Sequence, residues 1–142
     1  MAIRQAEAEW NGDLKTGSGR VKVESGLFEG RYSFTSRFEE GAGTNPEELL
    51  GAAHAACFSM ALSAGLGRAG HTPRRVFTIA KVHLGKVGEG FGLTQIDLET
   101  VGEVPGITQI QFEEFAQTAK QGCPISKALA AVPTITLKAT LK

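Results

Sequence analysis

Cysteine, aromatic residues and net charge are all scarce in this 142-residue sequence. It has two cysteines, one tryptophan and one tyrosine, and fifteen basic residues balance fifteen acidic ones. Cys57 and Cys123 are too few for the disulfide framework of a small secreted domain, and neither they nor His71 and His83 match a zinc-ligand spacing. Neither charge sign forms a long block, so charge indicates no nucleic-acid partner. We therefore expect no metal and no nucleic acid.

Targeting and membrane signals are missing as well. Residues 1–10 lack the apolar segment of a secretory signal, and no stretch approaches the roughly 18 consecutive apolar residues of a membrane span. The sequence therefore predicts a cytoplasmic protein without membrane contact. Hydrophobic residues make up 42% and charged residues 21%, which are ordinary globular values. At about 150 residues per domain, the length predicts one domain over residues 1–142.

Alternating apolar and polar residues predict an antiparallel meander of three strands within the first forty residues. Tyr32, Phe34, Ser36 and Phe38 define one face of the third strand, and Arg37 points to the opposite face. A solvent-exposed strand arginine is the simplest interpretation of Arg37. Only a partner carboxylate or an anion would make it functional.

The strongest boundary in the sequence is the start of a long helix near Asn45. Asn45 can cap the helix, Pro46 suits its first position, and Glu48 completes a capping box. We expect this helix to run to about Arg68, because alanine is abundant and no proline intervenes. Its surface is small and apolar nearly all round, which is typical of a buried central helix.

The remaining elements complete an α+β pattern. Residues 76–84 and 93–101 are predicted to form a β-hairpin. A helix follows, whose apolar positions begin at Phe112 and which ends at Gly122. Pro124 opens a short helix that reaches Ala131, and residues 134–141 alternate as a last strand. The sequence therefore predicts an α+β fold, with antiparallel and mixed β-sheet elements around a long central helix.

The two thiols have different local surroundings. A lone cysteine in an alanine-rich helix, as Cys57 is, often serves as a small buried hydrophobic residue. Cys123 lies at the N-cap of the following helix, where free N–H groups and the helix dipole stabilise a thiolate, or it is simply a poor cap. On local grounds Cys123 is the more acidic thiol. His54 lies three residues before Cys57 and is either a base beside it or a packed histidine.

Two motifs carry a family resemblance. They are TNPEELLGAAHAACFSM at residues 44–60 and GCPIS at residues 122–126. Together with residues 10–13, 35–39 and 104–106, they resemble the OsmC/Ohr family of thiol peroxidases, and the osmotically inducible OsmC branch in particular. The similarity covers nearly the whole chain, and it implies an OsmC-like intertwined homodimer.

The resemblance implies a specific chemistry. In this family a peroxidatic cysteine reduces organic hydroperoxides, and hydrogen peroxide less well, to alcohols without a bound cofactor. On that pattern Cys57 becomes a sulfenic acid and the resolving Cys123 then forms a disulfide with it. Arg37 would lower the pKa of the thiol, and Glu47 would hold the guanidinium in a fork. Arg20 is a second candidate for the arginine, and the resemblance gives His54 no catalytic role.

An external dithiol must reset the disulfide, and the resemblance indicates a lipoylated protein or a similar dithiol. Two other functions stay open on the residues alone. One is a thiol-disulfide oxidoreductase centred on Cys123, and the other is a non-catalytic dimeric binding module.

Helix geometry bears on how the site is assembled. Glu47 and Cys57 are ten residues apart, which places them about 15 Å apart along one continuous helix. If both belong to one site, either the helix breaks between them or the glutamate comes from a second copy of the chain. The unbroken alanine-rich run argues against a break. We therefore predict a two-fold homodimer in which Cys57 and Cys123 of one subunit meet Glu47 and Arg37 of the other.

Overall fold

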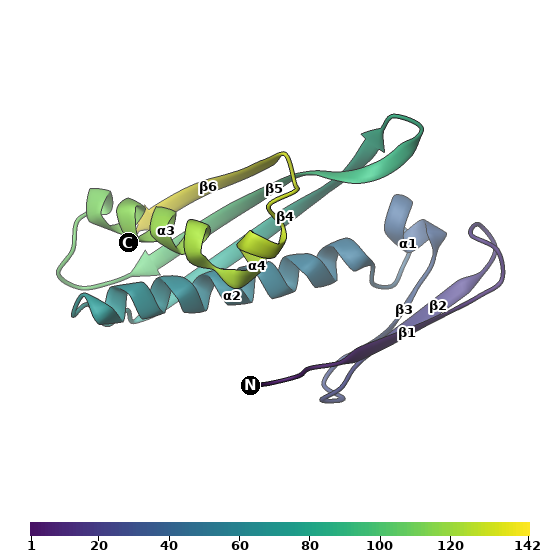
Figure 1. Cartoon of the computed structure of the whole chain (residues 1–142), viewed down its shortest axis with the longest axis horizontal. Helices are drawn as coiled ribbons and strands as arrows, with labels where there is room; N and C mark the ends of the chain where they lie inside the picture. Colours follow the sequence, from purple (N-terminus) through teal and green to yellow (C-terminus); the bar gives the residue numbers. More distant parts are fainter. The chain divides into compact units, whose positions relative to one another are not determined.

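A three-stranded antiparallel sheet forms the first part of the chain in the computed structural model, which describes all residues, 1–142 (Figure 1). The strands are β1 (Ala6–Asn11), β2 (Ser18–Val23) and β3 (Glu29–Tyr32), with β2 in the middle. The Trp10 and Tyr32 rings meet at 5.3 Å across Gly19. A Cβ atom at Gly19 would lie 2.5 Å from the Tyr32 ring, so only glycine allows this contact. The predicted meander is confirmed up to Tyr32.

The continuation of the third strand to Phe38 is wrong, because residues 34–38 form the short helix α1 (Phe34–Phe38). The Ser33 hydroxyl accepts a hydrogen bond from the Ser36 N–H, and the Ser36 hydroxyl accepts one from the Ser33 N–H at 2.8 Å. This reciprocal capping box satisfies N–H groups that a helix start leaves free. Phe34 and Phe38 then stack one turn apart, with ring centroids at 4.9 Å. Arg37 therefore lies on a helix.

The long helix α2 (Pro46–Arg68) begins and ends where the sequence predicts. The Asn45 side chain accepts a hydrogen bond from the Glu48 N–H at 2.8 Å, which confirms Asn45 as the cap. The Glu48 carboxylate accepts instead from the Thr44 hydroxyl at 2.6 Å, so the second bond of the expected capping box is replaced.

The chain forms two compact units, Met1–Leu49 and Leu50–Lys142, and the boundary falls inside α2. The organisation of residues 1–142 as a single domain stays a prediction. The first unit holds the meander and α1, and the second holds most of α2 and everything after it.

The second unit is built on a mixed sheet of β4 (Arg75–Val87), β5 (Gly90–Glu103) and β6 (Thr134–Leu141) (Figure 1). β4 and β5 form the predicted antiparallel hairpin, whose strands are longer than expected, and β6 pairs in parallel with β5. The helices α3 (Gln109–Gly122) and α4 (Pro124–Ala128) connect β5 to β6. The α+β class with mixed pairing is confirmed.

The core of this unit lies between one face of the sheet and the helices. Ile96 and Leu98 of β5, which point to the same face, pack against Phe58 of α2 and Phe112 of α3, and all four are fully buried. A Cβ atom at Gly102 would lie 2.4 Å from the Phe112 ring, so this glycine lets α3 approach β5. The helices therefore cover a single face of the sheet.

Burial of α2 is one-sided, which differs from the all-round burial expected of it. His54, Phe58, Leu62 and Leu66 are fully buried, whereas Met60 is 75% exposed. The reason is that one sheet and two helices cover only one side of α2 in a single chain. By length and composition alone α2 is apolar enough to cross a membrane, but its buried stripe belongs to the core.

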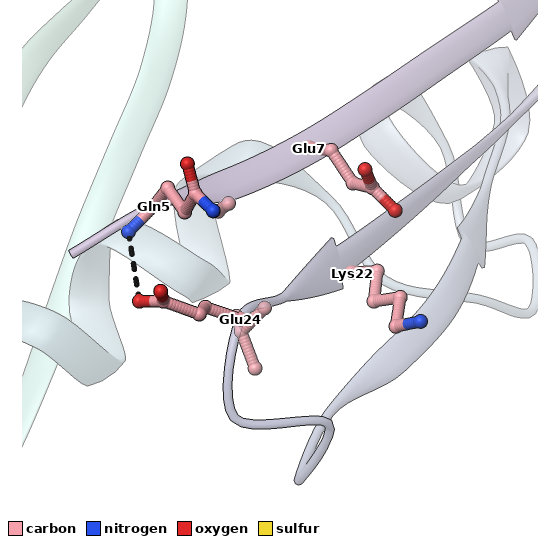
Figure 2. A pocket seen from close by; sticks show the side chains of 6 residues that line it. Gln5, Glu7, Lys22 and Glu24 are labelled. Atoms are coloured by element: carbon pink, nitrogen blue, oxygen red, sulfur yellow. Dashed lines mark hydrogen bonds between the residues drawn. The ribbon is translucent and has the colours of Figure 1, made fainter.

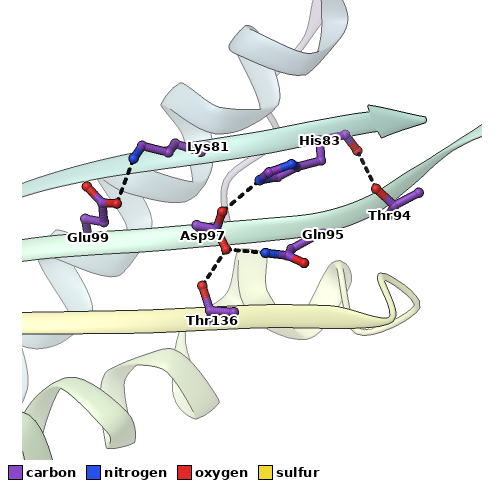
Figure 3. A network of polar contacts seen from close by, with 7 residues as sticks. All are labelled: Lys81, His83, Thr94, Gln95, Asp97, Glu99 and Thr136. Carbon is purple, nitrogen blue, oxygen red and sulfur yellow. Dashed lines mark hydrogen bonds and ion pairs between the residues drawn. The ribbon is translucent and has the colours of Figure 1, made fainter.

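A polar network follows the opposite face of the mixed sheet (Figure 3). Asp97 of β5 accepts hydrogen bonds from Thr136 of β6 and from Gln95, and it pairs with His83 of β4 at 2.7 Å. These contacts, the bond from Thr136 first, lower the pKa of Asp97 to about 2. Asp97 thus links all three strands through its ionised form.

We expect Asp97 to make unfolding sensitive to acid. Its pKa is lower in the folded chain than the ordinary value of 3.8, so its contribution to stability is present above about pH 4 and is lost as the pH falls towards about 2. Asp97→Asn should therefore unfold at lower urea concentration at pH 7 and lose less stability between pH 5 and 2 than the original chain. Glu89→Gln, in the exposed β4–β5 turn, removes the same charge as a control. Equal acid sensitivity of Asp97→Asn and the original chain would contradict this role.

Candidate active site

The structure brings the two cysteines together within the second unit. Cys57 lies in the middle of α2, and Cys123 lies between α3 and α4, where Pro124 starts the short helix. Their sulfur atoms are 2.8 Å apart and one thiol hydrogen-bonds to the other. Cys57 is partly exposed, and Cys123 is fully buried. The contact places the two sulfur atoms where they can form a disulfide.

The acidities of the two thiols diverge. Burial, followed by the contact with Cys123, raises the pKa of Cys57. Burial also tends to raise the pKa of Cys123. The contact with Cys57 and hydrogen bonds from Ser126 and Ile125 outweigh burial, so the pKa of Cys123 is lowered. This agrees with the expectation that Cys123 is locally the more acidic thiol. No arginine or lysine contributes to the pKa of Cys57.

His54 contacts the side chain of Ser126, three residues after Cys123, rather than the backbone. Its Nε2 atom lies 2.7 Å from the Ser126 hydroxyl, which belongs to α4, and both residues are buried. The other ring nitrogen, Nδ1, is buried without a hydrogen-bond partner. Burial lowers the pKa of His54, so the ring is neutral near pH 7.

The predicted arginine and glutamate meet in the first unit. Arg37 Nη2 donates to Glu47 Oε1 at 2.8 Å, and Arg37 Nε donates to the same carboxylate at 3.1 and 3.3 Å. The Glu47 side chain is only 10% exposed, whereas that of Arg37 is 37% exposed. Two nitrogens of the guanidinium thus engage the buried carboxylate, and Nη1 keeps its donors for another group. Arg20, the second candidate, pairs instead with Glu29 on the strand surface.

An apolar pocket of about 380 Å³ lies beside Arg37 in the same unit. Aromatic side chains of β1, β3 and α1 form most of its wall. The lining residues are Trp10, Gly12, Leu14, Tyr32, Ser33, Phe34, Arg37 and Phe38. The Arg37 guanidinium lies 5.3 Å from the centroid of the Phe38 ring, so the cation is held at the edge of an apolar surface.

A second pocket, of about 280 Å³, opens between the ends of β1 and β2 (Figure 2). Charged side chains dominate its lining, which includes Glu7, Lys22 and Glu24, and the Gln5 N–H donates to Glu24 at 3.3 Å. None of its residues is a cysteine or belongs to the Arg37–Glu47 pair. It therefore has no group suited to redox chemistry.

Comparison with known proteins identifies the family. Residues 39–138 match the family model described as OsmC-like protein. Peroxiredoxin OsmC of Escherichia coli (strain K12) is 51% identical over 133 residues, which cover 93% of each chain. The chain therefore belongs to the OsmC-like family.

Solved structures agree with this assignment. An organic hydroperoxide resistance protein OsmC from Legionella pneumophila has a TM-score of 0.71 at 24% identity, with 100% of this chain and 99% of the other covered. An organic hydroperoxide resistance protein from Elizabethkingia anophelis has a TM-score of 0.68 at 27% identity, with 99% and 97% covered. The family resemblance, the α+β class and the thiol-dependent peroxidase class that the sequence predicts are thereby confirmed.

Sequence reasoning missed one member of the site, Ser126. Ser126 lies within the motif that contains Cys123, but the motif alone indicates no role for it. The signal that was available is its position three residues after Cys123, one turn along a helix opened by Pro124. Its contact with His54 joins residues 72 positions apart, and nothing local in the sequence indicates such a contact.

The short distance between the sulfurs predicts that a mild thiol oxidant closes a Cys57–Cys123 disulfide without unfolding. Titration of free thiols should fall from two to none per chain, and mass spectrometry should show one intramolecular bond. Oxidation of Cys123→Ser by the same reagent should leave Cys57 as a monomeric adduct or an intermolecular disulfide. Two thiols that persist in the folded, oxidant-treated chain would contradict the observed contact.

Proposed function

We propose that this protein is a cysteine-based peroxidase that reduces organic hydroperoxides, and hydrogen peroxide less well, with Cys57 as the peroxidatic and Cys123 as the resolving cysteine. The contact between their sulfurs, at 2.8 Å, carries this proposal. Access supports the order of the two thiols, because Cys57 is partly exposed and Cys123 is fully buried.

The reaction divides into two steps and a reset. The Cys57 thiolate attacks one peroxide oxygen, the O–O bond breaks, and the alkoxide takes up a proton and leaves as alcohol. Cys57 is thereby oxidised by two electrons to a sulfenic acid. The Cys123 sulfur then attacks Cys57, the S–O bond breaks, and hydroxide leaves as water. A dithiol returns two electrons and restores both thiols by disulfide exchange.

A cation is needed for the first step, because the nucleophile is a thiolate and burial raises the pKa of Cys57. We assign Arg37 to this role. Glu47 holds two of its nitrogens, and Nη1 stays available for the thiolate or for the peroxide. An arginine oriented by a buried carboxylate in this way keeps its position and its charge.

The geometry of α2 argues that this arginine comes from a second copy of the chain. Because α2 is unbroken, Glu47 and Cys57 are separated by about 15 Å along its axis. Arg37 pairs with Glu47, so we assign both residues to the same subunit. The exposed apolar side of α2, formed by Ala52, Ala56 and Met60, also lacks cover in one chain. We therefore propose an OsmC-like intertwined homodimer with shared active sites.

The pocket beside Arg37 supports an organic substrate. Its wall is largely aromatic, so an alkyl or aryl tail gains apolar burial there, while the peroxide oxygens face the guanidinium. Hydrogen peroxide has no tail and gains none of this binding. The pocket is therefore the reason we assign the preference for organic hydroperoxides.

The reductant we propose is a dithiol, such as a lipoylated protein. A dithiol suits the site because its second thiol releases the mixed disulfide formed at the accessible Cys57. We place the protein in the cytoplasm, where reducing conditions sustain this cycle. A thiol-disulfide oxidoreductase centred on Cys123 is disfavoured, because an external disulfide cannot reach a fully buried sulfur.

Replacing each cysteine separates the two steps. Cys57→Ser should lose all reduction of tert-butyl hydroperoxide, because the attacking sulfur is gone. Cys123→Ser should consume one equivalent and stop, with one added oxygen on Cys57 by mass spectrometry. Oxygen on Cys123 in Cys57→Ser, formed at a comparable rate, would reverse the assignment.

Mixed dimers test the shared site. Cys57→Ser and Glu47→Ala should each be inactive alone, but heterodimers of the two should regain about one working site, since one subunit supplies the cysteine and the other the glutamate. As the mirror control, the double variant Cys57→Ser/Glu47→Ala should silence a wild-type partner. A monomer in solution would contradict the shared site. Peroxidase activity in heterodimers of the wild-type chain and the double variant would contradict it as well.

A further inference from the structure

The turn between β1 and β2 contains a motif that the two-cysteine reaction does not use. This motif is WNGD at residues 10–13, and Leu14 follows it directly. Leu14 is 59% exposed and lies outside the hydrophobic core. Exposure alone says little, because single exposed leucines are common on protein surfaces. What sets Leu14 apart is how its turn is held and what its side chain lines.

Hydrogen bonds fix the backbone on both sides of Leu14. The Trp10 indole donates from Nε1 to the carbonyl oxygen of Asp13 at 3.2 Å, and the Gly17 N–H donates to the same oxygen at 2.9 Å. The Asp13 carboxylate accepts from the Thr16 N–H at 2.7 Å and from the Thr16 hydroxyl at 2.6 Å. Asp13 thus closes the turn over residues 14–16 in the way that a cap closes the start of a helix.

This turn brings Leu14 to the pocket of about 380 Å³ beside Arg37. Leu14 is the one aliphatic side chain in the pocket lining, and the other large apolar groups there are aromatic rings. Those rings belong to β1, β3 and α1 and pack against one another in two pairs. Leu14 therefore supplies a separate part of the wall, which comes from a turn rather than from a strand or a helix.

We propose that Leu14 is a specificity-determining residue, which contacts the tail of bulky alkyl and aryl hydroperoxides and favours them over hydrogen peroxide. This inference deepens the proposed peroxidase function and rests on it. Leu14 touches the substrate tail. Asp13 acts through the turn and is a positioning residue.

Burial of apolar surface is the physical basis of this selectivity. A tail that enters the pocket covers the exposed part of Leu14, and the apolar area removed from water adds to binding. Hydrogen peroxide has no tail and gains nothing from Leu14. Because the turn already holds the leucine, little ordering of the chain opposes this gain when the substrate binds.

The test compares two peroxides in the first step alone. The reduced chain is mixed with cumene hydroperoxide or with hydrogen peroxide, without reductant, and peroxide loss gives a second-order rate constant for each. Their ratio is the selectivity. In Leu14→Ala this ratio should fall about tenfold, which is the effect of small changes in an apolar pocket. Leu14→Asn, which keeps the size but not the apolar surface, should also lower it, and Leu14→Met should keep the wild-type ratio.

A double-mutant cycle shows whether Asp13 acts through Leu14. Asp13→Ala removes both hydrogen bonds from Thr16 and should lower the selectivity ratio, whereas Asp13→Asn keeps an acceptor oxygen and should preserve it. Once Leu14→Ala has removed the contact, adding Asp13→Ala should lower the ratio no further.

The same unit offers matched controls for both residues. Leu27 is a leucine of the β2–β3 turn that is 91% exposed and does not line the pocket. Glu24 accepts a hydrogen bond from the Gln5 N–H at the opposite end of β1 and β2 (Figure 2). Leu27→Ala and Glu24→Ala should both keep the wild-type selectivity ratio.

A wild-type ratio in Leu14→Ala and Leu14→Asn would overturn the role of Leu14. Equal slowing with both peroxides would overturn it as well, because it would show that Leu14 supports the fold or a contact with a second copy. If Leu14→Ala does not fold by circular dichroism, Leu14→Asn and Leu14→Met decide. A wild-type chain that consumes neither peroxide would instead refute the proposed function, so the two failures are distinguishable.

Discussion

The site depends on one packing constraint, the burial of a single ridge of α2. His54, Phe58, Leu62 and Leu66 recur every four residues, and all of them are fully buried. Such a ridge packs against neighbouring elements in one rotational setting of the helix. Because Cys57 immediately precedes Phe58, that setting holds its sulfur at the rim of the core, where it is partly exposed and in contact with Cys123.

The same constraint disfavours the charged form of Cys57. The buried side of α2 faces apolar side chains and small hydroxyls, so the sulfur of Cys57 loses water and its pKa rises. A guanidinium built permanently into this core would carry a large desolvation penalty. The first unit instead keeps Arg37 partly exposed and paired with Glu47. The structure thus holds the Arg37–Glu47 charge pair in the first unit and favours the uncharged form of the Cys57 thiol in the second.

Local signals in the sequence predicted much of this structure. The cap at Asn45, the prolines at positions 46 and 124, and strict alternation along β6 fix element boundaries through interactions within a few residues. The strand expected at Phe34–Phe38 failed for a similar local reason. The face formed by Tyr32, Phe34, Ser36 and Phe38 at every second residue suggested a strand, but Ser33 and Ser36 cap a helix. Over so short a segment, the capping hydrogen bonds decide the secondary structure and the alternation of apolar and polar residues does not.

Long-range features of the site were less accessible from the sequence. The family resemblance supplied the pairing of Arg37 with Glu47, which local patterns alone left open. The contact of His54 with Ser126 had no such support, because it depends on how α4 docks against α2. The one-sided burial of α2 could not be predicted from the sequence either. Composition shows how apolar a helix is, but it does not show how many other elements of the same chain pack against that helix.

Access and acidity favour different thiols, and this opposition sets the order of the proposed reaction. Cys123 has the lowered pKa but no exposure, whereas Cys57 is accessible but has a raised pKa in the single chain. A peroxide molecule can only react with a sulfur that it reaches, so access decides the first step, and the acidity of Cys57 then depends on a cation brought to it. In the second step both sulfurs are already in contact, so access no longer matters and the acidity of Cys123 becomes an advantage. In the proposed reaction, burial therefore prevents Cys123 from acting as the first nucleophile and protects it until Cys57 has been oxidised.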